Sequence, residues 1–227
     1  MRIRTWLAAG ILLGGVPVAA RAQVLTFEGL GDEQPIPAAW YNGGLGGNFG
    51  VIFSSNSLSL IEESAGGSGN FQGEPSFKTA LVFLSGGAAT MDVAAGFTTG
   101  FSFFYSAIGS PGNINVWSGL DGTGTLLTSL HLPITPSGPY GTAPCPAPSG
   151  SAAYCPWVPI GVTFAGTAES VDFAGAANYI IFDDVTLGSN VPGNGPGNVV
   201  PEPASMSLLA TGLVGLMGVS RRRRRKA

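Results

Sequence analysis

Acidic side chains are the first candidates for chemistry, and they occur twice as adjacent pairs. Glu62 and Glu63 form one pair, and Asp183 and Asp184 form the other. The two carboxyl groups of a glycosidase must face each other across a cleft, whereas adjacent residues of a strand point to opposite faces. Neither pair therefore predicts a catalytic site, and we interpret Glu62 and Glu63 as solvated loop charges.

A single histidine, His131, limits the other catalytic arrangements. Any histidine-dependent triad or zinc site would need this residue, and no nucleophile motif lies near it in the sequence. The chain also has no phosphate-binding loop, dinucleotide-binding glycine pattern or metalloprotease helix. We therefore interpret His131 as a surface residue and predict that the protein is not an enzyme. A secreted glycan hydrolase or lyase is the least favoured alternative.

Aromatic side chains offer a different chemistry, because flat rings beside amides suit polyhydroxyl ligands. Trp117 is expected to face outward with Asn113 and Asn115, and Trp40 lies in a glycine-rich loop beside Tyr41. The sequence thus suggests Trp117 and Trp40 as stacking surfaces for sugar rings. The alternative is that these aromatics fill the core or plug loops.

The elements that must position these residues are strands. Residues 100–106 alternate between apolar and polar positions, as do residues 113–118, which lead through a glycine turn into 126–131. A first strand is expected at 24–28 and a last one at 179–187. Short strands separated by turn signals predict an all-β fold, an antiparallel β-sandwich of jelly-roll-like form with about ten strands.

The N-terminal residues 1–22 have the order of a secretory signal peptide. Arg2 and Arg4 precede an apolar run, and Ala20 and Ala22 give a small-x-small cleavage site before Gln23. The pattern predicts export through the Sec translocon, removal by signal peptidase, and a mature chain that starts at Gln23. A retained N-terminal anchor is the alternative.

The C-terminal end predicts a membrane segment. Residues 204–220 carry no charge and would rise roughly 25 Å as a helix, close to the thickness of a hydrocarbon core. A basic tail at 221–226 follows, which places this end in the cytoplasm and the body outside it. The basic residues are Arg221, Arg222, Arg223, Arg224, Arg225 and Lys226. A plain tail anchor is one interpretation.

Pro201, Glu202 and Pro203 immediately precede the apolar segment. The order of this tripeptide, the apolar segment and the arginine cluster resembles the PEP-CTERM sorting signal of Gram-negative bacteria. Proteins that carry this signal are processed by the membrane enzyme exosortase. The resemblance implies that the tripeptide is the recognition motif and that Arg221 to Arg225 stop transfer. It also implies an inner-membrane intermediate and a final place at the cell surface or in the exopolysaccharide matrix.

The terminal segments account for nine of the ten Lys and Arg residues, so only Lys78 lies between them. Twelve of the thirteen acidic residues lie in the body, which therefore has a formal charge of −11 although the whole chain has −3. Nucleic acid is excluded as a partner, since phosphate contacts need clustered cations. Cys145 and Cys155 enclose a loop in an exported chain and predict one disulfide.

Residues 180–187 resemble the closing strand of jelly-roll carbohydrate-binding modules. In those modules an acidic residue of the last strand and one of the first strand hold a structural calcium ion. The resemblance implies Asp183, Asp184 and Glu28 as calcium ligands here, and carboxylate oxygens suit that ion. The alternative is that these carboxylates accept hydrogen bonds from loop amides. No other cofactor is predicted.

The sequence thus predicts four parts: a signal peptide at 1–22, a β-sandwich domain at 23–189, a Gly/Pro/Asn linker at 190–199 and a sorting signal at 200–227. The leading interpretation of function is an exported, envelope-sorted protein with a structural or adhesive role. A carbohydrate-binding protein is the second interpretation.

Overall fold

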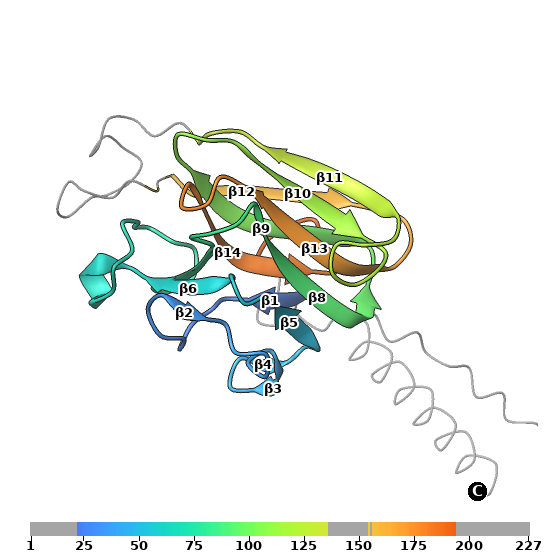
Figure 1. Ribbon diagram of the computed structural model, residues 1–227, viewed down its shortest axis with the longest axis horizontal. Helices are drawn as coiled ribbons and strands as arrows, with labels where there is room; N and C mark the ends of the chain where they lie inside the picture. The colour runs from blue at the N-terminus through green and yellow to red at the C-terminus, as the bar shows by residue number, and fades with distance from the viewer. Residues whose placement is uncertain (1–21, 136–153, 155, 194–227) are drawn as a thin grey trace, which may run out of the picture.

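The computed structural model describes residues 22–135, 154 and 156–193, and the regular secondary structure of these residues is almost entirely strand (Figure 1). The one helical element among them is a short 3₁₀ turn, η1 (Glu63–Ala65). All strand pairs within the sheets are antiparallel. The predicted all-β, antiparallel fold is therefore confirmed. The expected signal helix and membrane helix lie outside the described residues.

The larger sheet has seven strands in the order β12-β9-β14-β7-β6-β2, with β1 added beside β14. Its strands are β1 (Gln23–Leu25), β2 (Gln34–Pro35), β6 (Leu58–Ile61), β7 (Thr79–Val82), β9 (Gly100–Ala107), β12 (Val158–Thr163) and β14 (Ile180–Leu187). Because β1 pairs with β14, Gln23 lies opposite Leu187. The chain therefore enters the sandwich through β1 and leaves it through β14 at the same end of these two paired strands, where Gln23 and Leu187 lie opposite each other.

The smaller sheet has five strands in the order β11-β10-β13-β8-β5. These are β5 (Val51–Phe53), β8 (Ala88–Phe97), β10 (Gly112–Trp117), β11 (Leu126–Leu132) and β13 (Ala168–Gly175). A separate hairpin of β3 (Asn42–Gly44) and β4 (Gly47–Asn48) lies at the bottom of the view, below β5 (Figure 1). The predicted hairpin is confirmed, since β10 pairs with β11.

Aromatic side chains fill the core between the two sheets. Phe101, Phe103 and Tyr105 of β9 are buried, as their alternation predicted. They meet Phe173 of β13 and Phe182 of β14, whose ring centroids lie 4.9 Å apart at an angle of 67°. This edge-to-face packing adds about 1 kcal/mol per pair to the burial of apolar area. The core thus fixes how the two sheets face each other.

The larger sheet is covered on its outer face as well, which the alternation did not predict. A second apolar cluster includes Leu60, Val82 and Ile181 from the sheet, with Phe71 and Tyr154 from the covering segments. Phe71 belongs to the 62–78 segment, defined as the connection from the end of β6 to the start of β7, and Tyr154 lies before β12. All eight residues of β14 are buried in consequence.

The first and the last predicted strands differ from the structure: the first is shorter, and the last contains a bulge. The first ends at Leu25, because Phe27 has a φ of 62°, which is incompatible with extended backbone. The last contains a bulge between Asp183 and Thr186, where Asp184 has a φ of 49°. The assumption that Asp183 and Asp184 simply alternate between faces is therefore wrong.

Candidate functional site

Most of the predicted sorting, cleavage and disulfide residues lie outside the described part of the chain. Pro201, Glu202, Pro203 and the basic residues Arg221 to Arg225 lie outside the described residues, as do Ala20, Cys145 and Cys155. Of the predicted signal cleavage site, Ala22 and Gln23 are described, and Gln23 is the first residue of β1. The cleavage and the disulfide remain predictions.

Asp183 is fully buried at the start of the β14 bulge. Its carboxylate accepts hydrogen bonds from the Ser76 amide at 3.0 Å and from the Ser76 hydroxyl at 2.8 and 2.9 Å. The Asp184 amide also donates to it, at 2.7 Å. Burial, with a further effect from the charge of Asp184, raises the pKa of Asp183 well above its ordinary value. The carboxyl group therefore fastens the 62–78 segment to β14.

Glu28 has a comparable role on the other side of the same segment. Its Oε1 atom accepts hydrogen bonds from the amides of Lys78 and Thr79, both at 2.9 Å. Asp183 and Glu28 thus bind backbone amides, which was the alternative to a calcium site. No three His, Cys, Asp or Glu side chains gather into a metal-binding group in the part of the chain described here. Calcium would need backbone oxygens as further ligands, and it stays a prediction.

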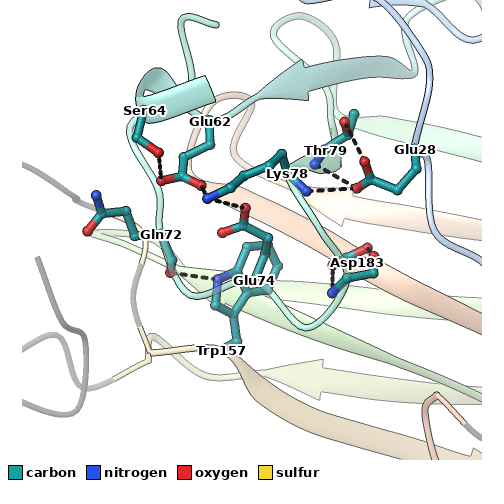
Figure 2. A network of polar contacts seen from close by, with 10 residues as sticks. Glu28, Glu62, Ser64, Gln72, Glu74, Lys78, Thr79, Trp157 and Asp183 are labelled. Atoms are coloured by element: carbon teal, nitrogen blue, oxygen red, sulfur yellow. Dashed lines mark hydrogen bonds and ion pairs between the residues drawn. The ribbon is translucent and has the colours of Figure 1, made fainter. Parts of the chain in front are cut away.

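A network of polar contacts occupies the 62–78 segment (Figure 2). The ammonium group of Lys78 lies 2.5 Å from Glu62 Oε2 and 4.0 Å from Glu74 Oε1. The Ser64 hydroxyl donates to Glu62 Oε1 at 2.5 Å. Glu62 is only 2% exposed, so the interpretation of it as a solvated charge is wrong, although Glu63 beside it is exposed.

The two carboxyl groups of this network have opposite pKa shifts. Burial, with a smaller contribution from the neighbouring Glu62 carboxyl group, raises the pKa of Glu74 to about 7. Burial alone would raise the pKa of Glu62, but hydrogen bonds from Lys78 and Ser64 outweigh it and lower that pKa. Glu74 and Lys78 were not identified as site residues from the sequence. The only signal was that Lys78 is the single basic residue of the body.

The outer face of the smaller sheet carries the residues suggested for glycan stacking. Ile114 and Val116 are buried, whereas Asn113, Asn115 and Trp117 lie on the opposite face, as predicted. Asn113 is hydrogen-bonded to His131 Nδ1 at 3.2 Å, and Asn115 accepts a hydrogen bond from Ser129 at 2.8 Å. His131 is exposed on β11, in agreement with its interpretation as a surface residue.

Trp117 is held in one orientation on this face. It lies opposite Ser170 of β13, and its indole N–H donates to Asp172 Oδ2 at 2.9 Å, two residues along the same strand. Thr90 of β8 donates to the other oxygen of Asp172 at 3.1 Å. The indole therefore lies across β13 instead of projecting away from the sheet.

Trp40 has different surroundings. Its half-buried ring packs against the main core, and its Nε1 atom is buried without a hydrogen-bond partner among the described residues. The neighbouring Tyr41 is buried, and its hydroxyl accepts a hydrogen bond from the Phe27 amide at 2.7 Å. Burial raises the pKa of Tyr41. Tyr41 therefore belongs to the core, whereas Trp40 and Trp117 are both half-buried.

Comparison with protein families identifies a known motif in the C-terminal segment. Residues 199–225 match the model of the PEP-CTERM protein-sorting motif. The chain therefore carries the sorting motif of an exported protein that is anchored in the membrane before an exosortase, a membrane enzyme, processes it. In the described part of the chain, no helix has both the length and the apolar character needed to cross a membrane.

The search of curated proteins found no match for this chain. Among solved structures, the K2 cleaved adhesin domain of Lys-gingipain matches with 13% identity and a TM-score of 0.46, covering 74% of this chain and 98% of that one. A glycoside hydrolase family 43 arabinoxylan arabinofuranohydrolase from Bacillus subtilis, in complex with cellotetraose, matches with 14% identity and a TM-score of 0.38. That match covers 71% of this chain and 28% of the other.

Proposed function

We propose that this chain is an envelope protein whose acidic β-sandwich has a structural or adhesive role at the cell surface or in an exopolysaccharide matrix. The observation that carries the proposal is the sorting motif at 199–225, joined to a single antiparallel sandwich. Export, membrane anchoring and exosortase processing deliver such a domain outside the cytoplasm. A non-enzymatic role comes first because the sequence offers no acid/base pair and only one histidine.

Deletion of the exosortase gene of the host tests this proposal. In wild-type cells the protein is expected in the surface or matrix fraction. In the deletion strain it is expected to accumulate in the inner membrane, because the recognition motif is no longer processed. An unchanged distribution in the deletion strain would contradict the proposal, and complementation with the gene is the control.

A second candidate function is carbohydrate binding on the outer face of the smaller sheet. The observation that favours it is the fixed indole of Trp117 beside the amides of Asn113 and Asn115. A flat ring with amide and hydroxyl neighbours suits a sugar ring. Asp92 and Asp172 on this face carry negative charge, so a neutral glycan is expected in preference to an anionic one.

A glycan array probed with the purified protein distinguishes the two functions. Carbohydrate binding predicts that a neutral glycan is retained by the wild type and lost in Trp117→Ala. Ile52→Ala is the matched control, because Ile52 is an exposed apolar residue of the same sheet but lies on its edge strand β5. Absence of binding by the wild type, or equal loss in both variants, would remove this candidate. Turnover of an untreated polysaccharide would instead indicate an enzyme.

A further inference from the structure

Two buried carboxyl groups share one ammonium group in the 62–78 segment. Glu62 is 2% exposed, and the side chain of Glu74 is 1% exposed. Lys78 is the only Lys or Arg among the described residues. Burying two carboxylates with a single cation leaves one negative charge without compensation, and an uncompensated buried charge strongly destabilises the folded state.

The distances show which carboxylate lacks a partner. Lys78 Nζ lies 2.5 Å from Glu62 but 4.0 Å from Glu74, so the ammonium group belongs to Glu62. Both carboxyl oxygens of Glu74 are buried and have no hydrogen-bond partner in the described part of the chain. A proton on Glu74 changes this, because the carboxylic acid can then donate a hydrogen bond to Glu62.

This cluster lies where the 62–78 segment closes over the larger sheet. Glu62 stands at its beginning and Lys78 at its end (Figure 2). Between them, Phe71 packs edge-on against Trp157 with ring centroids 6.0 Å apart. The indole N–H of Trp157 also donates to the Gln72 carbonyl at 3.1 Å. The segment therefore covers apolar residues that would otherwise meet water.

We propose that the cluster is a proton-controlled latch, in which one proton shared by Glu62 and Glu74 holds the 62–78 segment on the outer face of the larger sheet. Loss of that proton leaves two buried negative charges for one ammonium group. The segment then opens locally, because opening hydrates the Glu74 carboxylate.

The burial of Glu74 determines whether the closed state of the 62–78 segment becomes more or less stable as the pH rises. Folding raises its pKa from 4.5 to about 7, chiefly through burial, so the folded state binds the proton more tightly than the unfolded state. The proton on Glu74 therefore stabilises the folded state fully below about pH 4.5, and this stabilisation is lost as the pH rises through about 7. Glu62 and Lys78 are the charged groups that face Glu74, and Glu28 adds its charge on the far side of Lys78.

Hydrogen exchange of the purified full-length chain tests the latch. After correction for the chemical exchange rate, protection of the peptide 62–78 is expected to fall about tenfold between about pH 6 and about pH 8.5. Protection of β10 is expected to stay constant over the same range. In Glu74→Gln, the amide donates to Glu62 at every pH, so protection of 62–78 is expected to remain constant.

Glu33→Gln is the matched control. Glu33 is exposed and accepts a hydrogen bond from the Ser68 hydroxyl of the same segment at 2.8 Å, yet it does not belong to the cluster. It is expected to behave like the wild type. In Lys78→Met, the missing cation makes the pair hold its proton more tightly, so the loss of protection is expected at higher pH. A wild type without pH dependence, or Glu74→Gln with the wild-type dependence, would overturn the proposal.

Discussion

At the scale of single residues, the largest difference between sequence and structure concerns the carboxyl groups. Adjacent acidic residues attracted attention in the sequence, but the structure pairs acids with partners far along the chain. Ser76 and Asp183 are 107 residues apart, and Lys78 and Glu28 are 50 apart. Such pairs depend on which strands become neighbours in the sheet, so no local pattern could reveal them. By contrast, the outward position of Trp117 follows from local alternation.

The pH dependence of stability is a prediction at this scale. The folded wild type is stabilised by a proton on Glu74 that it has lost by about pH 8.5, whereas the amide of Glu74→Gln needs no proton. Glu74→Gln is therefore expected to unfold at a higher urea concentration than the wild type at about pH 8.5. The expected gain is about 1 to 3 kcal/mol. The two curves should converge as the pH falls toward the unperturbed value of 4.5. A constant difference at every pH would show that the substitution acts through packing and not through the proton.

Calcium provides a second prediction at the residue scale. The sequence implies Glu28, Asp183 and Asp184 as ligands, and a cation would compensate the buried charge of Asp183. Calcium is expected to raise the Tm of the wild type and to leave the Tm of Asp183→Asn unchanged. A calorimetric titration without binding, together with a constant Tm, would leave hydrogen bonding to backbone amides as the whole role of these carboxylates.

At the scale of elements, alternation predicted which face of β9 and of β10 points into the core. The hairpin of β10 and β11 and the aromatic face of β9 were both found where expected. Alternation failed for β14, which is buried on both faces, because the 62–78 segment covers its outer side. The sequence marked that segment only as a loop, since an irregular segment that packs on a sheet has no periodicity of its own.

The aromatic core of β9, β13 and β14 predicts where the stability lies. Phe173 is fully buried against Phe101, Phe103 and Phe182. Phe173→Ala is expected to lower the free energy of unfolding by about 3 to 5 kcal/mol, because it leaves a cavity between the sheets. Phe77→Ala is the control, since Phe77 is 80% exposed and should change stability by about 0.5 kcal/mol or less. Equal effects in denaturant unfolding would contradict this position of the core.

At the scale of the whole molecule, the two terminal segments differ from the body in charge and in predicted role. The terminal segments hold all but one of the basic residues, and the C-terminal one carries the sorting motif. The body is an acidic sandwich whose first and last strands, β1 and β14, lie side by side. A linker that leaves after β14 would therefore present the opposite end of the sandwich to the surroundings.

The sorting motif was easier to predict from the sequence than a binding face, for a physical reason. A sorting signal is linear, so its tripeptide, apolar segment and arginine cluster can be read in order from the sequence. A binding face collects side chains from several strands. Asp172 of β13 orients Trp117 of β10, and only the sheet order brings them together.

The intact mass of the mature protein recovered from host cells tests the central claim most directly. Exosortase processing predicts a chain that begins at Gln23 and ends close to Pro203, without the segment 204–220 and its arginines. A Pro201→Ala, Glu202→Ala double variant is expected to keep the tail, because the recognition motif is lost. Recovery of the wild type only as membrane-embedded protein with its complete C-terminus would contradict the claim and would indicate a plain tail anchor.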